Sequence, residues 1–283
     1  MTSSSTPTAR RQRLGAELRK LRERAGINAT EAAALLGGNQ ARISNIEAGR
    51  YGVSADRVRT LSCNYSCPDP ALVEALAAMT GDRKRGWWEE YREILSAGLL
   101  DLAELDHHGK ELRTAHTSGI PGLLQTADHA REVFRQVVPD LSPPEAEHRM
   151  SFRIKRQVVL FREDPAPYRA IIHEAALRMK FGGPAIARNQ LLQLLAMGER
   201  DHITIQVIPF DAGAYPGAGQ PVYYVHGPVP QLDTVQLDQS HGMTLLDAEA
   251  QLNKYRQVLA RLEAIALDAA ESRDFIHTIA KSL

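Results

Sequence analysis

A chain of 283 residues is long enough for two domains, and a hydrophobic content of 43% allows each to bury a core. Two cysteines are too few for a disulfide framework or a tetrahedral metal site, and we predict no metal or other cofactor. The net charge is zero, but residues 10–60 hold eleven Arg and Lys against five Asp and Glu. This basic segment is followed by an acidic remainder, which favours a polyanion as the partner of the first domain.

The first part of the chain is predicted to be a short tail, a small helical domain and a linker. Residues 1–9 are rich in Ser and Thr, lack the apolar segment of a signal peptide, and are expected to be disordered. Leu14, Leu18 and Leu21 recur at helical spacing, and helical patterns continue to residue 80. The polar residues 81–86 are the expected linker. No apolar run approaches the roughly 20 residues of a membrane span, so we expect a cytoplasmic protein without a membrane partner.

Residues 87–283 are predicted to form a second domain with an α+β fold. Residues 87–136 have a mostly helical pattern, interrupted at 119–122, and a charged helix is expected at 144–161. A strand at 168–172 and helices at 175–180 and 185–199 follow. From residue 202 apolar and polar residues alternate, and short segments at 221–226, 233–237 and 242–246 favour an antiparallel meander. Helices at 248–266 and 269–281 end the chain.

The most informative segment is residues 27–50. Asn28 can cap a helix, and Glu31 three residues later completes the pattern of a capping box. Gly37 can end that helix, because glycine adopts a positive φ at little cost. Asn39 can then cap a second helix after a turn of about three residues, which is the spacing of a helix-turn-helix.

The second of these helices has a polar outer face suited to DNA. Ile43 and Ile46 are expected to point into the core, which turns the intervening side chains outward. These outward residues are Gln40, Ala41, Arg42, Ser44 and Asn45. Gln and Asn can bond adenine, Arg can bond guanine, and Ala can contact a thymine methyl group in the major groove.

This segment resembles the Xre/Cro-type helix-turn-helix of phage repressors, including the ending Ile46–Arg50. The resemblance implies a lambda-repressor-like fold, a double-stranded DNA operator, and base contacts by Gln40, Ala41, Arg42 and Asn45. The residues assigned to DNA phosphates are Asn28, Asn39, Ser44 and Arg50. The sequence departs from the phage pattern at Ala29, where those proteins often have Gln, so one DNA contact is missing.

Landmarks in the rest of the chain extend the resemblance over almost all of residues 10–283. They are the segments 86–91, 121–126, 173–177 and 207–210, with Gly213. The chain is similar to the actinobacterial WhiJ-like regulators, also described as antitoxin-like, in which an Xre-type head precedes a domain of unknown function. The resemblance implies transcriptional regulation, often with a small partner protein encoded nearby. The alternative is an antitoxin-like protein whose main role is to neutralise that partner.

Three roles remain open for the second domain. The first is a pocket for a small-molecule effector, framed by residues 113–126 and 211–219. Its candidate residues are Trp87, Trp88, Arg113, Gln125, Tyr215 and Tyr223, with Tyr224 as a further aromatic wall. The simpler interpretation makes the tryptophans core residues and 211–219 an ordinary connection. The second role is a docking surface for a small partner protein.

The third role, catalysis, is not expected, because no metalloprotease motif, nucleophile elbow or phosphate-binding Gly-Lys loop occurs. We expect the protein to bind DNA as a homodimer, since one recognition helix contacts few base pairs. The helix at 248–266 carries Leu252, Tyr255, Leu259 and Leu262 on one face. That face suits either dimerisation or the core of the second domain.

Overall fold

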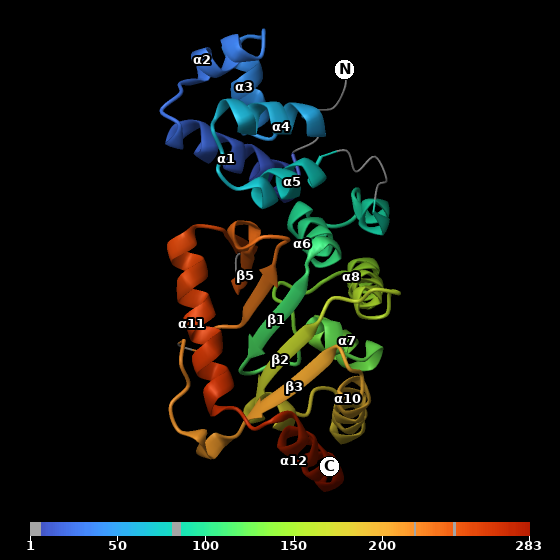
Figure 1. Cartoon of the computed structure of the whole chain (residues 1–283). Helices are drawn as coiled ribbons and strands as arrows, with labels where there is room; N and C mark the ends of the chain where they lie inside the picture. The colour runs from blue at the N-terminus through green and yellow to red at the C-terminus, as the bar shows by residue number, and fades with distance from the viewer. Residues whose placement is uncertain (1–6, 81–85, 218, 240–241) are drawn as a thin grey trace. The chain divides into compact units, whose positions relative to one another are not determined.

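The computed structural model of the chain describes residues 7–80, 86–217, 219–239 and 242–283 (Figure 1). These residues form two compact units. The N-terminal unit extends to Glu90 and includes Leu99–Leu105, and the C-terminal unit comprises Tyr91–Gly98 and Asp106–Leu283. Most of the predicted tail and linker lies outside the described residues, so both stay predictions. No described helix has the length and apolar character that a membrane crossing requires.

The first five helices of the N-terminal unit confirm the expected helical pattern. They are α1 (Ala9–Arg24), α2 (Ala29–Leu35), α3 (Gln40–Glu47), α4 (Ala55–Asn64) and α5 (Pro70–Ala78). Each begins after a residue whose side chain accepts a hydrogen bond from the first helical turn. These caps are Thr8, Asn28, Asn39, Ser54 and Asp69. Such caps satisfy amide groups that a helix start leaves without partners.

The core of this unit is built on α1. Leu14, Leu18 and Leu21 are buried, as the helical spacing predicts. A Cβ atom at Gly15 would lie 2.4 Å from the carbonyl oxygen of Glu47 and 2.5 Å from that of Ile46. Because α1 thus meets the backbone of α3 directly, the residue at position 15 must be glycine.

The C-terminal unit is built on a mixed sheet of six strands in the order β3-β2-β1-β4-β5-β6. The strands are β1 (Glu111–His116), β2 (Tyr168–His173), β3 (Ile203–Ile208), β4 (Val222–His226), β5 (Thr234–Gln239) and β6 (Gly242–Leu246). β1, β2 and β3 run parallel, whereas β4 is antiparallel to β1, β5 to β4, and β6 to β5. Parallel neighbours need crossover connections, which helices supply here.

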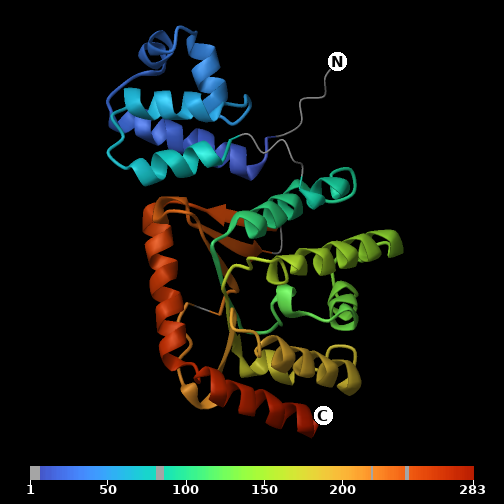
Figure 2. The same cartoon turned by 45° about the vertical axis from the view of Figure 1, so that its right-hand side comes forward.

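Helices cover both faces of the sheet (Figure 2). They are α7 (Ala127–Phe134), α8 (Pro143–Arg156), α9 (Glu174–Arg178), α10 (Pro184–Met197), α11 (Glu249–Ile265) and α12 (Ala269–Ser282). α11 packs on one face through Leu252, Leu259 and Leu262, which join a buried cluster with residues of β1, β2, β4 and β5. α7, α8 and α10 lie on the other face (Figure 2). A further helix, α6 (Ala97–His108), precedes β1.

Two expectations for this unit are corrected. Residues 111–116 form β1 near the centre of the sheet, inside the segment predicted to be mostly helical. The antiparallel meander exists, but it contains only β4, β5 and β6, because β3 lies at the opposite edge beside β2. Both errors have one cause. With β1 missed, the chain offered no central strand to separate β3 from β4.

Candidate nucleic-acid interface

The start of α2 has the full capping box that Asn28 and Glu31 predict. Asn28 Oδ1 accepts hydrogen bonds from the amides of Thr30 and Glu31 at 2.9 and 3.0 Å. Glu31 Oε2 in turn accepts from the amide of Asn28 at 2.8 Å. Asn28 and Glu31 are therefore bonded to each other in both directions, which fixes the first turn of α2.

The turn to α3 also follows the sequence prediction. Gly37 has a φ of +63° after the end of α2. Asn39 then caps α3, and its Oδ1 accepts from the amide of Arg42 at 2.9 Å. Ile43 and Ile46 are each 3% exposed. With this side of α3 buried, Gln40, Ala41, Arg42 and Ser44 are exposed and Asn45 is half-buried.

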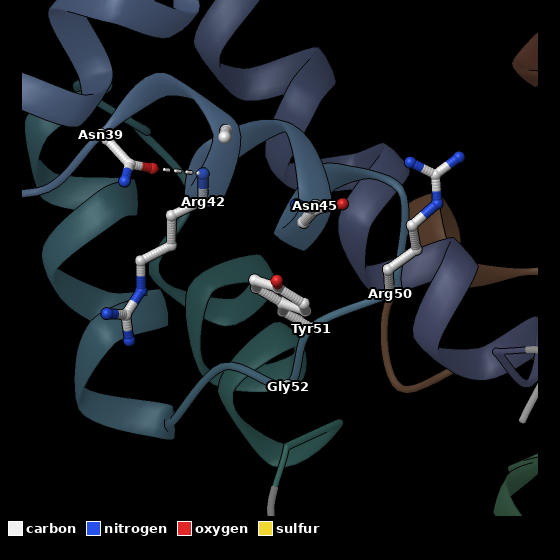
Figure 3. A pocket seen from close by; sticks show the side chains of 7 residues that line it. Asn39, Arg42, Asn45, Arg50, Tyr51 and Gly52 are labelled. Carbon is white, nitrogen blue, oxygen red and sulfur yellow. Dashed lines mark hydrogen bonds between the residues drawn. The ribbon is translucent and has the colours of Figure 1, made fainter. Parts of the chain in front are cut away.

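Several of the predicted DNA-binding residues line one open pocket with a volume of about 630 Å³ (Figure 3). Its lining residues are Asn39, Ala41, Arg42, Asn45, Arg50, Tyr51 and Gly52. Arg42 and Arg50 extend on opposite sides of Tyr51 (Figure 3). The surface therefore combines two guanidinium groups, which can bind DNA phosphates, with the side-chain amide of Asn45, which can bond a base edge. Gln40 and Ser44 are exposed on α3 outside this lining.

Tyr51 is the residue that sequence analysis missed at this surface. It is 55% exposed although it is aromatic, and its amide donates to the carbonyl oxygen of Asn45 at 3.1 Å. The amide of Arg50 donates to the same oxygen at 2.9 Å. These two bonds wrap the chain around the end of α3 and bring the phenol beside the recognition helix. A Tyr directly after the Ile46–Arg50 ending was the available sequence signal.

The orientation of α3 depends on a buried ion pair. Arg22 Nε and Nη2 donate to the two carboxylate oxygens of Glu47 at 2.6 and 2.9 Å. Arg22 Nη1 also donates to the carbonyl oxygen of Ile27 at 2.8 Å, just before α2. Hydrogen bonding to Glu47 raises the pKa of Arg22, so the guanidinium stays charged. One side chain of α1 thereby fixes α3 relative to the start of α2.

The four residues predicted to bind phosphate differ in what they can offer. Arg50 is exposed, and Ser44 is exposed on α3. The amide oxygens of Asn28 and Asn39 are used as caps, so only their amide nitrogens can donate to a phosphate without loss of a cap. At Asn28 the Glu31 carboxylate already holds the residue's own amide. The phosphate role of Asn28 through helix amides is therefore weaker than the sequence suggested.

The predicted effector pocket is corrected for the four candidates that lie in the C-terminal unit. Trp87 and Trp88 belong to the N-terminal unit, where their rings contact edge to face at 6.0 Å. The other four candidates lie in the C-terminal unit but on two faces of its sheet. Register places Arg113 opposite Tyr224 and Thr114 opposite Tyr223, so Arg113 and Tyr223 point to different faces.

Contacts confirm this division. Arg113 Nη2 donates to Glu263 of α11 at 2.6 Å, and Tyr215 packs on the cluster below the same helix. On the other face the Tyr223 hydroxyl donates to Asp106 at 2.6 Å, and Gln125 accepts from Arg153 of α8 at 2.7 Å. Because β1 was expected to be helical, the alternation that separates these residues was not foreseen.

The apolar face of α11 is core. Leu252, Leu259 and Leu262 are at most 2% exposed, and Tyr255 packs on the same cluster. The core alternative for these four residues is therefore confirmed, and the face is not open for dimerisation.

Two comparisons with known families agree with this geometry. Residues 13–81 match a family described as a helix-turn-helix domain, which defines the protein as a DNA-binding regulator by class. Residues 99–278 match the family described as a domain of unknown function (DUF5753), and the chain belongs to this family. Neither a curated protein nor a solved structure matches the chain.

Proposed function

We propose that this regulator binds a palindromic operator as a homodimer, with α3 of each protomer in a major groove. The observation that supports the proposal is the exposed polar face of α3 over the buried pair Ile43 and Ile46. α3 has eight residues, and a helix of this length contacts few base pairs. A second protomer doubles the contacts and gives useful specificity.

In this proposal Gln40, Ala41, Arg42 and Asn45 contact bases, and Arg50, Ser44, Asn28 and Asn39 contact phosphates. Tyr51 adds an aromatic contact beside Asn45. The proposed activity is binding, and it includes no catalytic step.

Selection of random DNA duplexes by the full-length protein tests the proposal. Two inverted half-sites whose centres lie about 10–10.5 base pairs apart are expected. Gln40→Ala should relax the consensus at one position of each half-site, while Gln257→Ala, an exposed glutamine on α11, should leave it unchanged. A consensus of one half-site, or a consensus unchanged by Gln40→Ala, contradicts the proposal.

We further propose that the C-terminal unit controls operator binding through a small ligand or a small partner protein. β6 is an edge strand of the described sheet, which is where a partner can add a strand. Control by a partner protein is tested by measuring operator affinity with and without the protein encoded by a neighbouring small gene. An antitoxin-like role predicts tight binding of that protein with no change in operator affinity.

A further inference from the structure

Three arginines share one face of α8, at positions 149, 153 and 156. Among the described residues, only the last of them has a carboxylate within 4.0 Å, and Arg149 interacts electrostatically with Glu145 at longer range. Arg156 Nε lies 2.8 Å from Oδ2 of Asp106, whose other oxygen accepts from the Tyr223 hydroxyl. Arg149 and Arg153 form no ion pair with any residue that the structure describes.

Arg153 is held by neutral groups. Its guanidinium carbon lies 4.3 Å from the centre of the Phe134 ring, and its Nη1 donates to Gln125 Oε1 at 2.7 Å. Gln125 is itself oriented, since its amide nitrogen donates to the carbonyl oxygen of Ile120. Burial lowers the pKa of Arg153 to about 10, although the group stays charged at neutral pH. By exposure Arg153 is half-buried, and a cation shielded from water without an anion is costly to the folded state.

A second polar group near Arg153 is also without a partner. His129 on α7 is 2% exposed, and neither of its ring nitrogens has a hydrogen-bond partner among the described residues. Burial, together with the charge of Arg153, lowers the pKa of His129 to about 4. The ring is therefore neutral at physiological pH, with one donor and one acceptor nitrogen. Its neighbour on one side is Phe181, at 5.4 Å between ring centres.

The carboxylate of Asp238 does not supply the missing partner. It favours the charged form of Arg153 electrostatically, but the two groups form no ion pair within 4.0 Å. One of its oxygens accepts from Gln236 at 2.6 Å. Asp238 thus offsets part of the cost of the buried cation without occupying its donors.

We propose that Arg149 and Arg153 bind the phosphate group of a small molecule, with His129 as a hydrogen-bonding neighbour. Side chains four residues apart on a helix can reach one tetrahedral anion, and arginine suits phosphate through its paired donors. Two positive charges match the charge of a phosphate monoester, about −1.5 to −2 at neutral pH. Phe134 and Phe181 favour an apolar or aromatic group on the ligand. This site would define the chemistry of the effector in the proposed function. Phosphate binding itself does not depend on that function, whereas its role in regulation does.

The test titrates phenyl phosphate into the full-length protein without DNA, with chloride holding the ionic strength constant. The readouts are the thermal unfolding midpoint and the NMR signals of the arginine Nε–H groups. A saturable rise of the midpoint and a shift of the Arg153 signal, assigned through Arg153→Lys, are expected. Arg153→Gln and Arg149→Gln should each weaken binding about tenfold or more. Arg135→Gln, an exposed arginine paired with Glu132, should bind like the wild type.

No saturable effect in the wild type would overturn the proposal. Equal binding by wild type and Arg153→Gln would also overturn it, because the phosphate would then bind elsewhere, for example on the basic N-terminal unit. Far-UV circular dichroism verifies that each variant folds, and the wild-type NMR titration decides the matter if Arg153→Gln does not. Because no DNA is present, failure of this site and failure of operator binding are separate results.

Discussion

Arg22 is buried in the N-terminal unit and Arg153 is half-buried in the C-terminal unit, but their partners differ. Arg22 makes two hydrogen bonds to the carboxylate of Glu47, and a third to a backbone carbonyl. Arg153 has an amide and an aromatic ring instead. In the N-terminal unit the buried charge is matched within the protein, and function lies on the exposed face of α3. In the C-terminal unit the unmatched polar groups are inside, which is where we expect function to lie.

Removal of each arginine should therefore have unequal consequences for stability. Arg22→Met leaves the Glu47 carboxylate buried without a partner and should lower the free energy of unfolding by about 3–5 kcal/mol. Arg153→Met removes a cation without a counterion but also removes its hydrogen bond to the buried Gln125, and because the two effects oppose each other the net change should be less than about 1 kcal/mol. Urea unfolding of both variants, followed by circular dichroism, measures the two values. Equal losses would mean that Arg153 is as well paired as Arg22.

The backbone contact between α1 and α3 gives the next largest effect. Gly15→Ala forces the two helices apart and should cost about 1–3 kcal/mol of stability, with weaker DNA binding because α3 is displaced. Gly119→Ala is the matched control, since no atom lies within 4 Å of its added methyl group and Gly119 lies outside the DNA-binding surface. Thermal unfolding of the two variants checks the prediction. A wild-type midpoint for Gly15→Ala would show that the helices do not meet as described.

A buried charge of the C-terminal unit that does have partners sharpens the comparison. Burial raises the pKa of Asp233, but hydrogen bonds from His226, Arg256 and Tyr224 outweigh it and lower the pKa to about 2. The unfolded carboxyl, with a pKa of 3.8, takes up its proton first as the pH falls. Asp233 should thus contribute about 2 kcal/mol above pH 4, which is lost between pH 4 and pH 2. Stability curves of wild type and Asp233→Asn should converge over this range; parallel curves would contradict the prediction.

The smallest expected effect concerns the phosphate contacts of the N-terminal unit. Arg50→Ala should weaken binding evenly across DNA sequences and reduce the slope of log affinity against log salt by about one. Fluorescence anisotropy at several salt concentrations measures the slope. Lys254→Ala, an exposed cation on α11, serves as the control. An unchanged slope for Arg50→Ala would remove Arg50 from the interface.

The sequence predicts the N-terminal unit well because its signals are local. Caps, Gly37 and the spacing of Ile43 and Ile46 act within a few residues of one another, so they define α2 and α3 without knowledge of the tertiary fold. The Arg22–Glu47 pair was not foreseen, because it joins residues 25 apart in the chain. Tyr51 was missed for a different reason, since its position beside Asn45 depends on the turn after α3.

The C-terminal unit is less predictable because its contacts are long-range. β1 is a central strand whose partners, β2 and β4, lie more than fifty residues later, and its sequence has no clear alternation. Residues of the loop 120–126 could be recognised as a landmark, but their purpose is visible only in three dimensions. There Gln125 meets Arg153, 28 residues further along the chain.

The central claim is that side chains of α3 contact bases directly. It is tested by measuring the affinities of wild type, Gln40→Ala and Asn45→Ala for the selected operator and for every single base-pair change in one half-site. Each variant should lose about 1–3 kcal/mol on the operator, and it should become indifferent to the base at one position while the others keep their wild-type preference. If both variants keep the full wild-type preference at every position, α3 is not the recognition helix.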